Sequence, residues 1–406
     1  MGLRSLIAAW RPRAPDRRAS GGPGEAKTAT LGGTLLFTGL TGTGEGERSY
    51  GALARDGFMR NPVVYRAVRL VAETVAAVPL LLYDGREELA EHALLDLLRQ
   101  PELGLDGAGF VERIVGHLLL SGNAFVEATR LDGRPRMLHA LRPDRVRLVD
   151  GADGWPEAYE YRVGSTLRRI PAAEAEGVGP LLHLRLFHPL SDGLGFAPLG
   201  AAGQALDLHN AAARWNRALI ENSARPSGAL VYRPGDGANL SPDQFDRLKS
   251  ELESGYAGAA RAGRPMLLEG GLDWKAMGLT PQEMDFMEAK NGAARDIALA
   301  FGIPPMLLGL PGDNTFANYQ EANRAFLRLT VLPLLSRLTS ALGHWLGAQF
   351  GAEGLRLAFD PDRIEGLAAE REALWARLGA ASFLSEDEKR EAVGYGPREA
   401  GAGRDA

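Results

Sequence analysis

Apolar residues spaced for helices and strands begin shortly after residue 60. Asn61 and Pro62 suit a helix start, and valines from Val64 to Val78 recur every three or four residues on one helical face before Pro79 ends it. Short strands are predicted at 80–83, 125–130, 146–149, 158–163 and 181–187, with helices at 92–99 and 110–121. Because helices alternate with short, separated strands, this region is predicted to be α+β.

Two long helices flank a compact insert in the next region. The first is predicted at 198–223, and the second starts at Thr280-Pro281 and ends at Gly302, before two prolines. The insert is predicted to hold strand 228–232, a helix opened by the capping box at 241–244, and strand 265–268. The arrangement suggests a support with a tip rather than a pocket.

The first long helix carries a polar stripe at helical spacing. The stripe consists of Asp207, Asn210, Arg214, Arg217 and Glu221. Such a charged face suits a helix that packs beside copies of itself, and it equally suits a face that meets water. The pattern alone leaves both interpretations open.

A loop rich in glycine, asparagine and threonine follows the second long helix, from Gly309 to Tyr319. It is longer than most connections between helices, and it is either a functional loop or an ordinary surface loop. Beyond it, with Asn318 as a helix cap, a helix is predicted to about residue 350, bent near Pro333. A strand at 355–359, a helix capped by Asp360-Pro361-Asp362 and a short helix after Ser385 complete the pattern.

Composition limits the classes of function. The 406 residues can hold two or three domains, and residues 1–57 are poor enough in apolar side chains to predict a flexible arm. The net charge of −5 argues against tight binding of nucleic acid through neutralised phosphates. There is no cysteine, no signal-peptide pattern, and four interruptions (Arg328, Pro333, Arg337, His344) in the most apolar stretch. We therefore expect a soluble cytoplasmic protein.

Catalytic and metal-binding patterns are weak. His183, His188, Ser191 and Asp192 lie close together in the sequence, but proximity along the chain is not the geometry of a triad, and a structural role is favoured. Asp360 and Asp362 read as a turn and cap more readily than as metal ligands. No catalytic residue, metal site or cofactor is predicted.

Seven stretches together resemble the portal proteins of tailed bacteriophages of the Hong Kong 97 type. They are 61–79, 122–127, 141–146, 183–195, 222–228, 297–309 and 314–322. Their order and spacing carry the resemblance, which extends from about residue 58 to about residue 350. The arm before Tyr50 and the tail after Gly379 have no matching pattern.

The resemblance implies a portal fold assembled as a dodecameric ring. Its parts would be a flexible N-terminal arm (1–57), a wing (58–195), a first stem helix (196–224), a clip (225–277), a second stem helix (278–303), a tunnel loop region (304–318), and a wing-return helix with a C-terminal crown (319–406).

The implied function is a conduit for double-stranded DNA at one capsid vertex. In this interpretation the residues that face DNA, without sequence specificity, are Gly312, Asp313, Asn314, Thr315, Phe316 and Asn318, and the polar stripe meets neighbouring subunits. The implied partners are the terminase large subunit, which hydrolyses ATP, a head–tail adaptor and the major capsid protein; no membrane or cofactor is implied. The protein would assemble in the host cytoplasm and end in a virion or gene transfer agent particle. The alternatives are a monomeric adaptor that binds through the insert and the hydrolase considered above.

Overall fold

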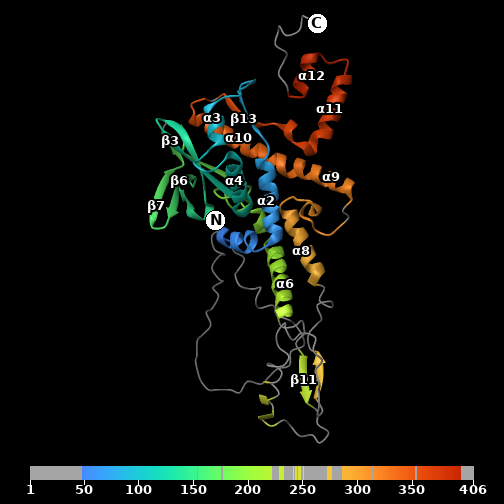
Figure 1. The fold of residues 1–406 in the computed structure, drawn as a ribbon. Coiled ribbons are helices and arrows are strands. Elements are labelled where there is room, and N and C mark those ends of the chain that lie inside the picture. Colours follow the sequence, from blue (N-terminus) through green and yellow to red (C-terminus); the bar gives the residue numbers. More distant parts are fainter. Residues whose placement is uncertain are drawn as a thin grey trace, which may run out of the picture. The chain divides into compact units, whose positions relative to one another are not determined.

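A computed structural model describes residues 48–394 apart from 153, 175–176, 222–227, 233–240, 242, 245, 248–249, 251–271, 277–285, 313–314 and 353. Helices and antiparallel strands alternate along this part of the chain (Figure 1), so the predicted α+β class is confirmed.

The ordered chain starts before the predicted first helix. Helix α1 (Tyr50–Ala52) and the π-helical turn η1 (Leu53–Phe58) precede α2 (Pro62–Ala76). The expectation that the flexible arm reaches residue 57 is therefore wrong for its last eight residues, 50–57. Leu53 is buried in the main core, and the Tyr50 hydroxyl lies 3.2 Å from Nδ1 of His117 on α4 (Gly107–Ser121). Because these contacts come from distant segments, local composition gives no sign of them.

The main core forms around α2, α4 and α10 (Leu332–Gln349). The valine face of α2 is buried as predicted, and α3 (Ala93–Arg99) adds four leucines to the same core. Strand β1 (Leu80–Asp84) pairs with β2 (Glu87–Glu88) and with β13 (Leu355–Phe359), where Leu82 lies opposite Leu357. The C-terminal part of the chain thus returns to complete the core of the first region.

Two further sheets lie next to this core. One has the order β10–β3–β4, with β3 at Asn123–Leu131, β4 at Arg134–Leu141 and β10 at Leu181–Arg185; the other has the order β5–β6–β7, at Val146–Asp150, Pro156–Val163 and Thr166–Pro171. A small apolar cluster that includes Phe125, Tyr159 and Ile170 joins the two sheets. The short strands β8 (Ala173–Glu174) and β9 (Gly177–Val178) form a separate pair.

Strands β4 and β7 were missed by the sequence patterns. Their sequences, RPRMLHAL and TLRRIP, contain too many charged residues for a clear alternation. They are strands because tight turns fold them back on β3 and β6. At Asp132-Gly133, between β3 and β4, both residues have positive φ, of 53° and 77°, as a two-residue hairpin turn requires.

The first predicted long helix is two helices in the structure, α5 (Pro198–Ala201) and α6 (Gly203–Glu221), because the chain leaves helical geometry at Ala202. Helix α8 (Phe286–Ala300) packs against α6, and Leu206, Ala212 and Ile297 are buried there.

In the insert, β11 (Gly228–Tyr232) is the predicted strand and pairs with β12 (Leu272–Ala276). The capping box is present, with Ser241 and Gln244 exchanging hydrogen bonds of 3.0 and 3.3 Å. Strand 265–268 and the start at 280–281 lie outside the described residues.

A continuous helical segment follows, made of α9 (Phe316–Phe326), a π-helical turn η5 (Leu327–Val331) and α10. The π turn directly precedes Pro333, whose missing N–H disturbs the regular ladder at the position where a bend was predicted. In the part of the chain that the structure describes, Phe316–Gln349 is the one helix long and apolar enough to cross a membrane by length and composition. Leu338, Leu342 and Leu346 bury its apolar face in the main core, which accounts for that composition.

Helix α11 starts later than the sequence predicts. Asp360-Pro361 opens the 3-10 turn η6 (Pro361–Arg363), a second turn η7 (Glu365–Leu367) follows, and α11 begins only at Ala368 and ends at Ala380. The predicted cap on a long helix at Asp360 is thus wrong, because Ile364 and Leu367 are held in the core and fix these turns. The last helix, α12 (Glu386–Ala392), follows Ser385 as predicted, and Ser385 caps it.

Candidate functional site: the loop before α9 and the outer face of α6

The loop before α9 starts from a firmly fixed helix end. Gly302 lies at φ 66°, and the N–H of Ile303 donates to the carbonyl of Ala298 at 2.9 Å, which closes α8 as predicted. The Thr330 hydroxyl donates to the Gly302 carbonyl at 2.6 Å and so ties the end of α8 to η5. A Cβ at Gly302 would lie 2.7 Å from that hydroxyl oxygen, so glycine is needed here for space as well as for its φ.

The middle of the loop has one anchor from α8. The chain passes through the 3-10 helix η4 (Pro305–Leu308), which Gly309 ends at φ 72°. Further on, the guanidinium of Arg295 donates to the carbonyl of Pro311. Arg295 therefore fixes where the chain emerges at Gly312, before Asp313 and Asn314, which lie outside the described residues.

Helix α9 begins three residues earlier than a cap at Asn318 predicts. Thr315 is the N-cap, and its hydroxyl accepts from the backbone N–H of Asn318 at 3.3 Å. Phe316 and Asn318 therefore lie in the first turn of α9 rather than in the loop, and the expectation that Asn318 caps the helix is wrong. Both residue types can cap a helix, but the backbone is extended at Thr315, which is where the cap must be.

The start of α9 presents a continuous exposed surface. Every side chain from Phe316 to Glu321 is exposed, and Phe316 and Tyr319, at 78% and 50% exposure, are three residues apart on one face. The sequence has no lysine or arginine from Gly309 to Asn323, and the nearby Arg295 is held by Pro311. This stretch offers no cation of its own to neutralise the phosphates of a polyanion that lies beside it.

The polar stripe of α6 divides into an inner and an outer half. Asp207 pairs with Arg48, while the Asn210 side chain accepts from the Asn61 amide and donates to the Asp56 carbonyl, both at 2.9 Å. These two residues are engaged within their own chain. Arg214 and Arg217 are exposed, and the Glu221 side chain lies outside the described residues. The contact of this stripe with other copies stays a prediction, with Arg214 and Arg217 as its exposed residues among those whose side chains the structure describes.

Asn61 is a buried junction that the sequence identified only as a helix cap. Its Oδ1 accepts from the backbone N–H groups of Val63 and Val64, and its amide nitrogen lies 3.0 Å from Nδ1 of His209 and 2.9 Å from Oδ1 of Asn210. Burial, and next the charge of Lys290, lower the pKa of His209, so a neutral ring accepts this hydrogen bond. Asn61 is only 1% exposed, and both its amide nitrogen and its oxygen are used in hydrogen bonds. It therefore links α2 to α6.

A second junction joins the end of α4 to the segment before α5. Oδ1 of Asn123 accepts from the Gly195 N–H at 2.7 Å, and its amide donates to the Gly195 carbonyl at 3.0 Å. The backbones are so close that a Cβ at Gly195 would lie 2.1 Å from the carbonyl oxygen of Gly122. Gly122 itself caps α4 at φ 73°. This crossing brings together two of the stretches that carry the family resemblance, 122–127 and 183–195.

The residues considered for a hydrolase have structural partners. His183 stacks on Phe125, and its Nε2 lies 2.9 Å from Oδ1 of Asn123; burial lowers the pKa of His183 to about 4. Nδ1 of His188 accepts from the N–H of Leu190, and the Ser191 hydroxyl accepts from the N–H of Leu194, both at 3.0 Å. The backbone carbonyl of Asp192 accepts from Arg185. These bonds shape β10 and the turn after it. Among the described residues, no group of three or more acidic, histidine or cysteine side chains is placed to hold a metal ion.

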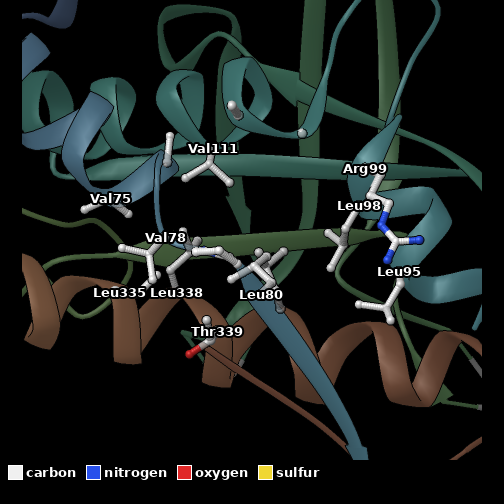
Figure 2. Close-up of a pocket in the computed structure, with 15 residues that line it drawn as sticks. Val75, Val78, Leu80, Leu95, Leu98, Arg99, Val111, Leu335, Leu338 and Thr339 are labelled. Atoms are coloured by element: carbon white, nitrogen blue, oxygen red, sulfur yellow. The ribbon is translucent and has the colours of Figure 1, made fainter. Parts of the chain in front are cut away.

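An apolar pocket of about 410 Å³ lies between the end of α2, α3, the start of α4 and α10 (Figure 2). Its lining is mostly valine and leucine. The polar side chains in it are Arg99, which pairs with Asp96 at 3.2 Å, and Thr339, whose hydroxyl donates to the Ser336 carbonyl at 3.1 Å. The pocket therefore offers a space for apolar groups and no arrangement suited to acid–base or nucleophilic chemistry.

A family model described as phage portal protein matches residues 62–394. Among solved structures, the chain is similar to a protein in the neck of a gene transfer agent particle. The structures of the empty particle neck, computed with C6 symmetry, and of the native neck, computed with C12 symmetry, are both 51% identical to this chain. Each match covers 87% of this chain and 95% of the neck chain, with TM-scores of 0.70 and 0.67.

Two more distant proteins that this chain resembles are also named as portal proteins. The probable portal protein of Streptomyces phage phiC31 is 28% identical over 354 residues, which cover 84% of this chain and 76% of the phage protein. The HK97 family phage portal protein from Corynebacterium diphtheriae is 18% identical, with coverage of 79% and 97% and a TM-score of 0.53, a likeness that shows the fold alone.

Proposed function

The chain belongs to the phage portal protein family, and from that premise we propose that it forms the portal ring of a phage or gene transfer agent particle, through which double-stranded DNA enters and leaves the head. The observation that carries the proposal is the 51% identity to a particle-neck protein over 87% of this chain. A ring of twelve copies follows the C12 symmetry with which that native neck was computed.

Within the ring we assign each part of the chain a place. The α2–α4 core with the sheets of residues 58–195, completed by α10 and β13, is the wing; α6 and α8 are the stem; the β11–β12 insert is the clip; and α11 with α12 is the crown. In support, α6 and α8 pack along one another, and β13 pairs with β1 across the chain.

DNA would pass the loop and the start of α9, at Gly312, Asp313, Asn314, Thr315, Phe316 and Asn318. Three observations support this assignment. The first turn of α9 is exposed, the loop is positioned by Arg295, and no cation lies between Gly309 and Asn323. DNA must slide through such a channel, and each neutralised phosphate adds affinity that opposes sliding. A stretch without lysine or arginine suits that requirement.

Neighbouring copies would meet at the outer half of the α6 stripe. Arg214 and Arg217 are exposed there, and Asp207 and Asn210 are half-buried and bonded to Arg48 and Asn61. The remaining interactions of the ring are with other particle proteins: a terminase large subunit, which supplies ATP hydrolysis, a head–tail adaptor and the major capsid protein. We assign no catalysis to this chain. Assembly would take place in the host cytoplasm, before the ring enters the particle.

The experiment that tests this function is the assembly state of the purified full chain. Negative-stain microscopy and native mass spectrometry should show closed rings, most of them dodecamers. A protein that stays monomeric at high concentration contradicts the proposal and favours the adaptor alternative. Within a ring-forming protein, Arg214→Glu should lower the yield of rings. Arg134→Glu, an equal charge reversal at an exposed position on β4, should not.

A further inference from the structure

Burial rises along α9 from its start to its end. Residues 316–321 are exposed, residues 322–325 are half-buried, and Phe326 is 2% exposed. Within α9, which the structure describes throughout, Phe326 is the only buried residue. The helix is therefore held at its C-terminal end, and its exposed start projects from that end.

The length of α9 amplifies any change at its base. The helix has 11 residues from Phe316 to Phe326, so its start lies about 15 Å from its end. A tilt of about 10° at the end of a helix of this length moves its start by about 2.5 Å. The place of the exposed surface at Phe316 and Tyr319 is therefore set where α9 meets α10 (Figure 1).

The junction η5 between the two helices is π-helical. The direction of α9 therefore does not follow from an unbroken α-helical ladder through α10, and contacts with other segments have to set it. One side of the junction meets the C-terminal turns. A carboxylate oxygen of Glu370 lies 3.4 Å from Arg324 and 3.5 Å from Arg328, and a Cβ on Gly366 would overlap the Leu327 side chain.

The other side of the junction is joined to the end of α8 by Thr330. The Thr330 hydroxyl donates to the Gly302 carbonyl at 2.6 Å. Phe301 and Ile303, on either side of Gly302, are 4% and 2% exposed, so this carbonyl belongs to a fixed part of the chain. The bond links the residue where α8 ends to the turn that follows α9. It thereby closes the segment that contains the loop and α9.

We propose that Thr330 is a positioning residue for the DNA-facing surface: its bond to Gly302 sets the angle at which α9 leaves η5, and so where Phe316 lies. The proposal rests on the portal function proposed above. Thr330 acts through α9, because the whole length of that helix separates it from the surface that meets DNA. Arg295 holds the same segment at Pro311, ahead of α9, so the two contacts fix it from both ends.

Hydrogen exchange tests whether Thr330 holds α9. Thr330→Val keeps the shape of the side chain and removes the hydroxyl, whereas Thr330→Ser keeps the hydroxyl. In rings of the full chain, the amides of residues 320–326 should exchange about threefold to tenfold faster in the valine variant and at the natural rate in the serine variant. Faster exchange confined to the end of α8 would show that the bond serves α8 alone, and would overturn the proposal.

Thr74→Val is the matched control. It removes a bond of the same length, 2.6 Å, from a threonine hydroxyl to the Leu70 carbonyl, but that bond stays within α2. Exchange in α9 should therefore be unchanged in this variant. An equal acceleration in both valine variants would mean that α9 responds to any loss of stability, and the specific role of Thr330 would be refuted.

The DNA content of particles tests the consequence for function. Particles assembled with Thr330→Val rings should contain severalfold less DNA than particles with natural rings, and Thr330→Ser should restore the natural content. Ring yield and thermal unfolding should stay unchanged in both variants, because Gly302 is exposed and water replaces the missing hydroxyl. A merely structural role would instead lower ring yield or thermal stability together with DNA content.

The outcomes separate this role of Thr330 from the portal function itself. If the natural chain forms no rings, both proposals fail. If natural rings form and package DNA, but exchange in α9 is the same in the valine variant, only the role of Thr330 is wrong. If exchange in α9 rises while DNA content stays natural, Thr330 holds α9 without positioning it for DNA, and the proposal is again overturned.

Discussion

Two short polar segments differ sharply in their surroundings: the crossing at Gly122, Asn123 and Gly195, and the loop from Gly309 to Thr315. At the crossing, two backbones touch, and one buried asparagine satisfies the Gly195 N–H and carbonyl as well as His183. The loop has one side-chain anchor from α8, the Arg295 bond to the Pro311 carbonyl, and is followed by six exposed side chains.

This difference separates residues that make the fold from residues available for function. A substitution at the crossing has to displace backbone atoms, so it should act on stability. A substitution at the start of α9 meets solvent, so it should leave the fold intact and act on whatever passes the loop. The predictions below test this division, from the largest expected effect to the smallest.

Gly195→Ala should have the largest effect on stability. The new Cβ would lie 2.1 Å from the Gly122 carbonyl oxygen, and neither backbone can move without breaking the bonds to Asn123. We expect a loss of about 3 kcal/mol or more in the free energy of unfolding, measured by urea titration at fixed protein concentration. Gly116→Ala is the control, because no atom lies within 4 Å of its Cβ and alanine favours α4; equal losses in both variants would contradict the account.

Acid should weaken the same region. Burial lowers the pKa of both His183 and His117 to about 4, so in the folded chain each histidine binds its proton far less readily than in the unfolded chain. Their stabilisation is therefore complete above pH 6.5 and declines as the pH falls towards 4, by up to about 3 kcal/mol for each histidine. Urea unfolding between pH 7 and pH 4.5 measures the decline. His183→Gln should flatten the curve, and an unchanged slope would show that His183 does not contribute.

Asn61→Ala should cost about 2 kcal/mol, because it removes a helix cap and leaves His209 and Asn210 without their buried donor. Asn61→Asp separates these two roles, since a carboxylate still caps α2 but cannot donate to Nδ1 of His209. Thermal unfolding of both variants measures the effect. If the aspartate variant is as stable as the natural chain, the hydrogen bonds from Asn61 to α6 do not contribute to stability, and the helix cap accounts for the whole effect.

Arg295→Ala should have the smallest effect on stability, below about 0.5 kcal/mol, because its bond to Pro311 is exposed. Rings should still form. The position of Gly312 is no longer fixed, so the account predicts that DNA packaging into particles falls while ring yield does not. Full packaging with this variant would show that the loop does not need to be held in place.

The sequence predicts the parts of the fold that local patterns determine. The buried face of α2, the caps at Asn61, Gly122, Ser241 and Ser385, and the end of α8 at Gly302 are all where the residues indicate. Strands β4 and β7 and the ordered segment at residues 50–58 were missed, because distant partners stabilise them and their own composition does not reveal it.

The candidate site was predicted less completely for the same reason. The length and composition of the loop marked it as a candidate and left open whether it is a functional loop or an ordinary surface loop. The cap at Thr315 and the anchor from Arg295 depend on backbone geometry that spacing does not define. Likewise, helical periodicity placed Asp207 and Asn210 on the same stripe as Arg214, but only the fold brings Arg48 and Asn61 against the first two. For the loop and for the α6 stripe alike, these contacts depend on tertiary structure, which spacing along the chain does not reveal.

The central claim is that the start of α9 lines a DNA channel. The most direct measurement places a photo-activated benzoyl-phenylalanine at position 316 or at position 103 of the full chain and recovers filled particles. After illumination, the account predicts protein–DNA cross-links from position 316 and none from position 103, although both side chains are exposed. Intact, DNA-filled particles that cross-link equally from the two positions, or only from position 103, would contradict it.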